Sequence, residues 1–229
     1  METHSENGWL GLSASHVDFI VAQTEILSPP LVPEVKLHLA HESVPLWQKT
    51  EEELGEMGLA PPFWAFAWAG GQALARYILD QPEIVRGKAV VDLASGSGLV
   101  GIAAMKAGAK SVLAADIDAF SATAIALNAG LNNVVMAVNT DDLLSLPLPE
   151  ADVLLIGDLF YERALAARVL AFAECANAAG MTVLIGDPGR SYLPKDRLEK
   201  LAEYSVPVSR DLEDSEIKRS AVWRLRSYY

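Results

Sequence analysis

This sequence has only one cysteine, no long apolar run and no excess of basic residues. Its single cysteine, Cys175, cannot form an internal disulfide, which excludes a disulfide-stapled secreted domain and favours a reducing compartment. It lies in the apolar helical run of residues 164–179, where a buried structural thiol is expected. No run is long enough for a membrane span, and the opening METHSENG resembles neither a signal nor a transit peptide. These absences predict a cytoplasmic protein that does not act at a membrane.

Basic residues are outnumbered: 18 Lys and Arg stand against 30 Asp and Glu, for a formal net charge of −12. Because a phosphate backbone is bound by clustered Lys and Arg, this balance argues against a nucleic-acid partner and suits a cationic protein surface. The hydrophobic content of 51% over 229 residues is enough for a substantial core. We expect one α/β domain over residues 61–229, preceded by a helical and extended N-terminal extension over residues 1–60.

Within the extension the pattern predicts a helix in residues 9–27, a short strand in 34–40 and an acidic helix in 51–58. His38 and His41 lie close together in the sequence, but their spacing matches no zinc-enzyme signature. No metal site is expected.

The most informative stretch is VVDLASGSGLVG, residues 90–101. It reads as the end of a buried strand, a carboxylate, a run of small residues and the start of a helix. Gly96 and Gly98 allow a tight turn and a close approach to a ligand, while Gly101 allows the helix to pack against the strand. Backbone N–H groups at such a turn bind polar or anionic ligand groups. A nucleotide-like cofactor is the first hypothesis; a tight turn with no ligand is the alternative.

Two carboxylates separate the cofactor hypotheses. Asp116 follows the next predicted strand at the distance expected for a group that holds a ribose diol. In a typical NAD loop the strand runs straight into the first glycine, whereas here Asp92-Leu-Ala-Ser intervenes, which resembles motif I of class I S-adenosylmethionine methyltransferases. S-adenosylmethionine carries an ammonium that an acid near the loop, such as Asp92, is able to meet directly or through water.

Strands alternate with helices through the rest of the chain. Buried strands are expected at residues 89–91, 111–115, 134–138, 152–156 and 181–185, helices at 72–80, 99–107, 119–130, from 162 onwards and at 194–203, and an antiparallel pair at 204–211 and 218–226. Five parallel strands followed by an antiparallel pair predict a Rossmann-like α/β fold, the seven-stranded arrangement of a class I methyltransferase.

Acidic residues follow four predicted strands, so their side chains are expected to share one edge of the sheet. They are Asp92, Asp116, Asp142 and Asp158. Ligands of open parallel sheets bind at this carboxyl edge. Asp142 is expected to accept the exocyclic amine of adenine, with its neighbour Asp141 and a helix-capping role as alternatives. The later turn of residues 186–189 is interpreted as purely conformational.

Two further segments belong to the expected site. PPFWAFAWAGG, residues 61–71, is dense in aromatics, and Trp68 is the candidate to cover a flat cationic cofactor, although core packing explains such rings equally well. In GDLFY, residues 157–161, Asp158 and Tyr161 are three apart, so both would lie on one face at a helix start. A capping Asp158 and a packed Tyr161 are the alternative.

Three segments carry a resemblance to a known family: residues 61–98, GDLFYE and VLIGDPGR. Together with SPPLVPEVKLHLAHE they resemble the electron transfer flavoprotein β-subunit lysine methyltransferases over residues 27–226. The resemblance implies an S-adenosylmethionine-dependent protein-lysine N-methyltransferase whose substrate is that β-subunit. It also implies that Asp158 and Tyr161 shape the lysine channel. The residues implied to contact the cofactor are Trp68, Gly96, Gly98, Asp116, Asp142 and Gly157. The chain departs from the pattern at Ala94-Ser95, where a glycine is frequent.

Other functions remain open at this point. Within methyltransferases the runner-up is an enzyme for a ribosomal-protein lysine, whereas the NPPY motif used on planar amino groups is absent. From other classes, the glycine pattern also fits an NAD-dependent oxidoreductase, and the fold also suits a binding module without catalysis.

Overall fold

The computed structural model describes residues 13–40, 61–207 and 217–226. The described helices are α1 (Ala14–Gln23), α3 (Ala69–Asp80), α4 (Leu99–Lys106), α5 (Ala119–Leu131) and α6 (Arg163–Ala178). The described strands are β1 (Glu25–Leu27), β2 (Leu37–Leu39), β3 (Ala89–Leu93), β4 (Ser111–Ala115), β5 (Ala137–Asn139), β6 (Val153–Gly157), β7 (Thr182–Asp187), β8 (Leu198–Pro207) and β9 (Ile217–Leu225). Single 3₁₀ turns connect several of them.

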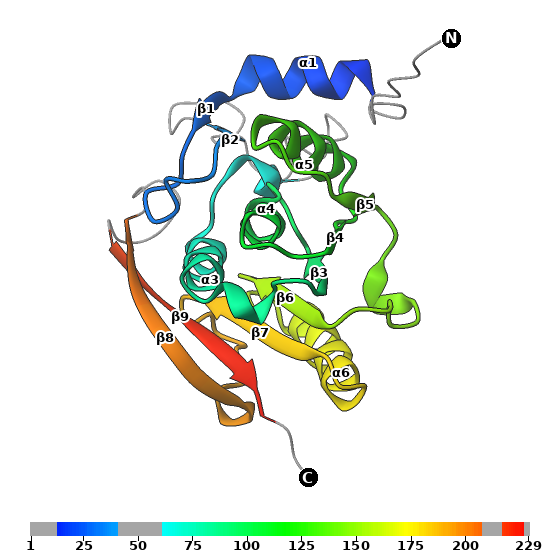
Figure 1. Ribbon diagram of the computed structural model, residues 1–229, viewed down its shortest axis with the longest axis vertical. Helices are drawn as coiled ribbons and strands as arrows, with labels where there is room; N and C mark the ends of the chain where they lie inside the picture. Colours follow the sequence, from blue (N-terminus) through cyan, green and yellow to red (C-terminus); the bar gives the residue numbers. More distant parts are fainter. Residues whose placement is uncertain (1–12, 41–60, 208–216, 227–229) are drawn as a thin grey trace.

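Seven strands form the central sheet in the order β5-β4-β3-β6-β7-β9-β8 (Figure 1). The first five are parallel, and β9 joins β7 antiparallel with β8 outside it. The predicted fold of five parallel strands and a C-terminal antiparallel pair is therefore confirmed. The chain runs outward from β3 through β4 to β5 and then returns to the other side of β3 with β6. In open α/β sheets, ligands bind beyond the carboxyl ends of the strands at such a change of direction, which here are β3 and β6.

Helices cover both faces of the sheet. Adjacent residues of β6 point to opposite faces, so Leu155 packs with Leu74 of α3 in one apolar cluster and Ile156 packs with Phe172 of α6 in another. All four side chains are buried. Figure 1 shows α3, α4 and α5 on the side of the sheet opposite α6.

The N-terminal segment packs on the outside of α5 (Figure 1). The helix predicted in residues 9–27 is confirmed as α1, which ends at Gln23, where the Thr24 hydroxyl donates to the Ile20 carbonyl at 2.6 Å. The chain then forms β1, in which Glu25 pairs with Leu39 of β2, the short strand expected within residues 34–40. The predicted helix at 51–58 lies outside the described residues.

The C-terminal prediction of a helix at residues 194–203 is wrong. Leu198, Leu201 and Tyr204 recur every three residues, as on a helix, but this segment forms β8 and pairs along β9. A β-bulge between Lys200 and Ala202 inserts an extra residue into the strand, which breaks the two-residue alternation and imitates helical spacing. The antiparallel pair is real, but β8 starts six residues earlier than the expected 204, and residues 208–216 lie outside the description.

Two smaller expectations also fail. Cys175 is exposed, because the buried face of α6 is formed by Phe172, Ala173 and Ala176 and the thiol projects beyond it. The third parallel strand is β5 at residues 137–139 instead of 134–138, and Val135 before it is exposed.

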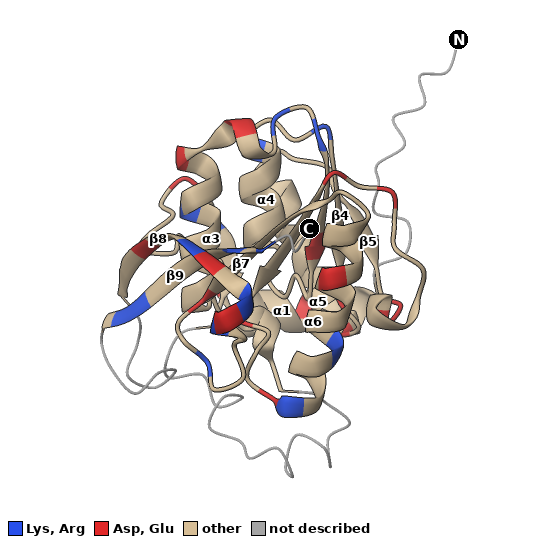
Figure 2. Ribbon diagram, turned by 90° about the horizontal axis from the view of Figure 1, so that it is seen from below, with Lys and Arg blue, Asp and Glu red and all other residues tan. Residues whose placement is uncertain are grey.

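Charges of both signs are distributed over the described surface. Figure 2 shows Lys and Arg interspersed with Asp and Glu, including along β8 and β9. Among the described helices, none combines the length and the apolar character that crossing a bilayer requires.

Candidate functional site

The glycine-rich loop joins β3 to α4 at the predicted position. Gly96 (φ +54°) and Gly98 (φ +83°) both have left-handed backbones, which other residues adopt at a cost. A Cβ on Gly101 would lie about 3.0 Å from the Asp92 carboxylate and from the Met136 sulfur, so its close-packing role is confirmed. The loop therefore owes its shape to the three glycines that define the motif.

Asp92 shapes this loop from behind. Its Oδ2 accepts hydrogen bonds from the Gly101 N–H at 2.8 Å and the Ser95 hydroxyl at 2.6 Å, and the residue is 1% exposed. Burial raises the pKa of Asp92 to about 6. Ala94, where the resembled motif frequently has glycine, also has a left-handed backbone (φ +52°). The carboxylate thus holds the turn together, and its contact with a cofactor stays a prediction.

Asp116 lies beside the loop at the end of β4. Leu93 of β3 is in register with Ala115, which places Asp116 next to the turn. Its carboxylate accepts the Gly96 N–H at 2.8 Å and the Asp118 N–H at 3.0 Å. Burial raises its pKa. The structure therefore brings the carboxylate expected for a ribose diol into contact with the loop.

Asp142 lies farther along the same edge, after β5. Its Oδ2 pairs with Arg168 of α6 at 2.5 Å and accepts the Ser145 hydroxyl at 2.8 Å. The hydrogen bond from Arg168 lowers its pKa. Asp141 instead donates its N–H to the Asn139 side chain. Neither contact tests the expected adenine interaction, so the choice between Asp141 and Asp142 stays open.

Asp158 follows β6 in an unusual environment. Its backbone has a left-handed φ of +54°, its N–H donates to the Gly186 carbonyl at 2.9 Å, and the residue is 9% exposed. Its Oδ2 accepts the Gly71 N–H from the first turn of α3 at 2.9 Å. Gly157, just before it, packs so closely on Gly71 that a Cβ would lie 3.3 Å from the Gly71 Cα. The carboxylate is thus clamped between β6 and α3.

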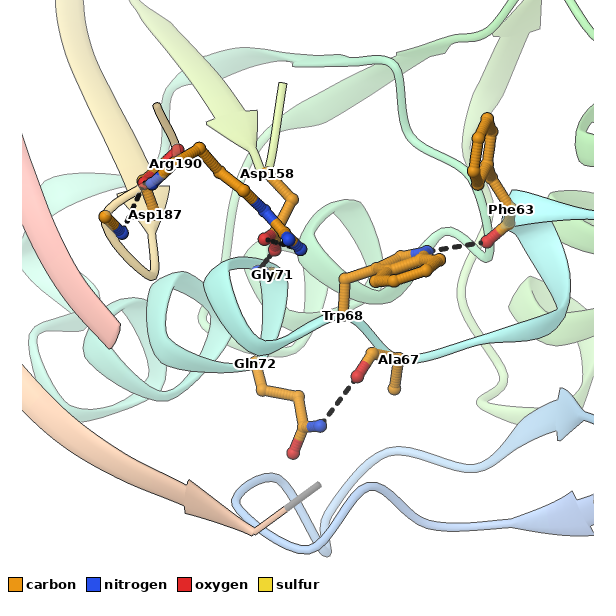
Figure 3. Close-up of polar contacts among 9 residues, drawn as sticks. Phe63, Ala67, Trp68, Gly71, Gln72, Asp158, Asp187 and Arg190 are labelled. Atoms are coloured by element: carbon orange, nitrogen blue, oxygen red, sulfur yellow. Dashed lines mark hydrogen bonds and ion pairs between the residues drawn. The ribbon is translucent and has the colours of Figure 1, made fainter. Parts of the chain in front are cut away.

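An arginine completes this environment. Arg190 Nη2 lies 3.2 Å from Asp158 Oδ1, and its guanidinium carbon lies 5.9 Å from the centroid of the Trp68 ring (Figure 3). The Trp68 indole N–H donates to the Phe63 carbonyl at 3.0 Å, which orients the ring. Burial raises the pKa of Asp158 to about 7, although the Arg190 charge opposes that rise. We call the Asp158 carboxylate and the Trp68 ring together the cation site.

The interpretation of residues 186–189 as a purely conformational turn missed this arginine. Asp187 Oδ1 accepts the N–H groups of Gly189 and Arg190 at 2.6 and 2.7 Å, and so presents Arg190 toward Asp158. A signal is present in the sequence, because Asp187 ends a fifth parallel strand, as the acids expected in the site follow other parallel strands. The turn is both conformational and part of the site.

Tyr161 does not share a helix face with Asp158, contrary to expectation. Residues 158–162 form a loop, and Glu162 caps α6 by accepting the Ala164 N–H. Tyr161 is 48% exposed, and its ring centroid lies 5.9 Å from that of Phe63. Phe63 lies 5.9 Å from Trp68 in turn, so the three rings form a row beside the cation site. Burial, followed by the charges of Glu162 and Asp116, raises the pKa of Tyr161.

No cluster of three His, Cys, Asp or Glu side chains suitable for a metal occurs among the described residues. His38 is buried, and its Nδ1 lies 3.1 Å from the Thr24 hydroxyl. His41 lies outside the described residues.

Solved structures share this fold. A Thermoplasma acidophilum protein matches with a TM-score of 0.53 at 18% identity, over 69% of this chain and 90% of its own. Trm5b from Pyrococcus abyssi matches with a TM-score of 0.52 at 14% identity, over 90% of this chain and 56% of its own. A family model described as ribosomal protein L11 methyltransferase (PrmA) matches residues 72–157. The sheet order and the glycine loop are those of a class I methyltransferase.

Relatives that match most of the chain define the family further. The electron transfer flavoprotein beta subunit lysine methyltransferase of Danio rerio is 39% identical over 214 residues, covering 90% of this chain and 82% of the relative. The Homo sapiens protein of the same name is 37% identical over 212 residues, covering 90% and 80%. This chain therefore belongs to the electron transfer flavoprotein beta subunit lysine methyltransferase family.

Proposed function

We propose that this protein is an S-adenosylmethionine-dependent protein-lysine N-methyltransferase whose substrate is the β-subunit of electron transfer flavoprotein. The observation that carries the proposal is the match to lysine methyltransferases over 90% of the chain, which includes the acidic and aromatic surroundings of Asp158. A cation site of this kind suits a lysine side chain, because a carboxylate and an aromatic face both attract an ammonium.

The residues of the glycine loop fit the cofactor. Gly96 leaves space where a side chain would stand, because a Cβ there would meet no atom closer than 3.8 Å, whereas a Cβ on Gly98 would lie 3.4 Å from the Ile125 Cα. Asp116 supplies a carboxylate for a ribose diol, and the neighbouring Ile117 exposes 73% of its surface as an apolar face for a flat base. S-adenosylmethionine supplies a methyl group on a sulfonium. Gly157 and Trp68 are proposed to contact the cofactor as well.

In this reaction the protein orients the substrate lysine and controls the loss of a proton from its ammonium group. A free lysine has a pKa of about 10.4, so forming its neutral amine at neutral pH costs about 4 kcal/mol. Asp158 binds the incoming ammonium and so directs the lysine side chain toward the loop. The aromatic rings of Tyr161, Phe63 and Trp68 form one wall of the channel. The proton leaves to water, because a carboxylate favours the ammonium and does not lower its pKa.

The ribosomal-protein alternative is supported over a smaller part of the chain. The L11 methyltransferase of Caldicellulosiruptor saccharolyticus is 44% identical over only 63 residues, 28% of this chain. The matching family model ends at Gly157, one residue before Asp158. The shared part therefore carries the glycine loop and Asp116 but none of the cation site.

We also place the protein in the cytoplasm, as the sequence predicts.

Incubation with labelled S-adenosylmethionine and purified electron transfer flavoprotein tests the proposal. Label is expected on lysines of the β-subunit, identified by mass spectrometry, with L11 as the comparison substrate. Calorimetry with S-adenosylhomocysteine and NADH tests the cofactor, and only the former is expected to bind. Label on L11 alone would replace the substrate assignment, and a bound donor without label on either protein would favour a non-catalytic module.

A further inference from the structure

We propose that Arg190 occupies the cation site in the free enzyme and that the substrate lysine enters by displacing it. The inference rests on the proposed function, since it names the group that the substrate must replace. Arg190 is thus a positioning residue that sets how tightly, and at which pH, a lysine is bound.

The contacts of Asp158 carry the first step. Its Oδ2 is bound to the Gly71 N–H, and its Oδ1 faces Arg190 Nη2 at 3.2 Å. The guanidinium also lies against the Trp68 ring, so a carboxylate and an aromatic face meet one cation (Figure 3). A lysine ammonium carries the same charge and is bound by the same two groups. Arg190 therefore marks the place that a substrate cation would take.

The two cations are not expected to share this place. Two positive charges about 4 Å apart repel each other strongly at a site near the surface, where the effective dielectric constant is lower than that of water. The oxygen that faces the guanidinium is Oδ1, whereas Oδ2 already accepts the Gly71 N–H of α3. Exchange is therefore favoured over simultaneous binding.

The displaced guanidinium has space to enter, and a buried carboxylate oxygen with no hydrogen-bond partner in the described part of the chain lies in the same turn. A cavity of about 300 Å³ adjoins Arg190, lined by Tyr161, Pro188, Gly189, Ser191 and Lys218 as well. Asp187 Oδ2, in the same turn, is buried and has no hydrogen-bond partner among the described residues. The backbone of Arg190 is held by Asp187 Oδ1, so the side chain moves while the turn stays in place.

Arg190 also keeps the site ready for a cation. The charged groups that act on Asp158 are Arg190, which lowers its pKa, and Asp187, which raises it. Without Arg190 the buried carboxyl would bind a proton more readily and lose its attraction for an ammonium. The arginine is therefore a competitor of the lysine at high pH and a support for its binding at low pH.

Steady-state kinetics of Arg190→Gln on the flavoprotein substrate test both consequences. At about pH 8.5, between the Asp158 pKa of about 7 and the lysine pKa of about 10.4, KM is expected to fall about threefold, with kcat changed less than about twofold, as for loss of one partly buried ion pair. The acidic limb of kcat/KM is expected to move to higher pH. A higher KM at that pH, or an unmoved limb, overturns the proposal.

Two variants serve as controls. Arg190→Lys keeps a cation beside Asp158, so its acidic limb is expected to stay near that of the parent. Arg224→Gln removes the same charge and an exposed ion pair, to Glu199 at 2.6 Å, on the surface of β9. It is expected to leave KM and the pH profile unchanged.

A probe that requires no methyl transfer separates this inference from the proposed function. Butylammonium, which like a lysine side chain is cationic at about pH 8.5, is titrated into the protein with S-adenosylhomocysteine while the Trp68 indole N–H resonance is followed. Arg190→Gln is expected to bind the probe about threefold more tightly than the parent. Tighter binding in a protein that does not methylate the flavoprotein would sink the proposed function alone. Methylation with no gain in probe affinity would sink the inference alone.

Discussion

A single buried carboxyl, Asp158, connects the sheet, the first turn of α3 and the turn after β7. It accepts an N–H from Gly71 and faces Arg190, and its own backbone is left-handed. The surrounding residues therefore fix Oδ2 in place, and Oδ1 faces a cation. If Asp158 acts as proposed, few changes at this position are expected to preserve activity, even where the fold survives.

Asp158→Asn preserves the shape of the side chain and an acceptor for Gly71 but removes the charge. Because an ammonium then meets no anion, kcat/KM for the protein substrate is expected to fall by about 100-fold or more, and Asp158→Ala by at least as much. The affinity for S-adenosylhomocysteine, measured by calorimetry, is expected to stay within about twofold. Undiminished methylation by either variant would remove Asp158 from the lysine site.

Ala94 offers a second test at this scale. Its left-handed backbone (φ +52°) costs an alanine about 1 kcal/mol, which glycine does not incur. Ala94→Gly is therefore expected to raise the free energy of unfolding by up to about 1 kcal/mol, measured by chemical denaturation. The control is Ala126→Gly in the middle of α5, where the same exchange is expected to lower it by about 0.5–1 kcal/mol. A loss of stability in both variants would contradict the strain at Ala94.

At the scale of elements, the site depends on how closely α3 approaches β7. A Cβ on Gly186 would lie 2.1 Å from the Gly70 carbonyl oxygen, and a Cβ on Gly70 would lie 2.3 Å from the Gly186 carbonyl oxygen. Such contacts are possible only between glycines. The close approach of α3 to β7 also brings the Gly71 N–H to Asp158. The same glycines therefore determine both the packing of the helix and the geometry of the site.

Adjacent glycines of α3 provide a matched pair for this point. Gly70→Ala is expected to lower the free energy of unfolding by about 1–3 kcal/mol, because the new methyl group meets backbone and the Asp158 carboxylate. Gly71→Ala, whose nearest neighbour would be a Val100 methyl at 3.8 Å, is expected to be neutral or to add up to about 1 kcal/mol. Urea denaturation measures both. Equal stabilities would mean that the helix does not approach the strand as described.

For the whole molecule, the buried carboxyls make stability depend on pH in an unusual direction. Burial raises the pKa of Asp92 to about 6 and of Asp158 to about 7, from an ordinary value of 3.8. The folded chain binds these protons more tightly than the unfolded one. Their contribution to stability is therefore complete below the ordinary value and is lost as pH rises through the folded values.

Comparison of Asp158→Asn with the parent isolates this effect. The variant cannot titrate at residue 158, so its free energy of unfolding relative to the parent is expected to rise as the pH increases from about 4 to about 7 and to level off above. Denaturant titrations at a series of pH values measure the difference. Parallel curves for the two proteins would show that the Asp158 pKa is the same in both states.

Local pattern was sufficient for the existence of the five parallel strands and for the glycine turn, although not for the bounds of β5. Buried strands are recognisable by their apolar composition, and the glycines of residues 96–101 predict the tight turn between β3 and α4. Periodicity failed at β8, because its bulge imitates helical spacing and its pairing with β9 is a long-range choice. It failed at Cys175 because an alanine-rich helix shows little difference between its faces.

The sequence by itself determined the fold class, the glycine turn and the placement of acids along one edge of the sheet. These follow from spacing along the chain and from the parallel direction of the strands. Only the tertiary structure decided what each acid does: Asp92 holds the turn, Asp116 lies against it, and Asp158 faces a guanidinium 32 residues away. The position of Arg190 depends on the approach of β7 to α3, and side chains meet across such a contact through packing that no local pattern encodes.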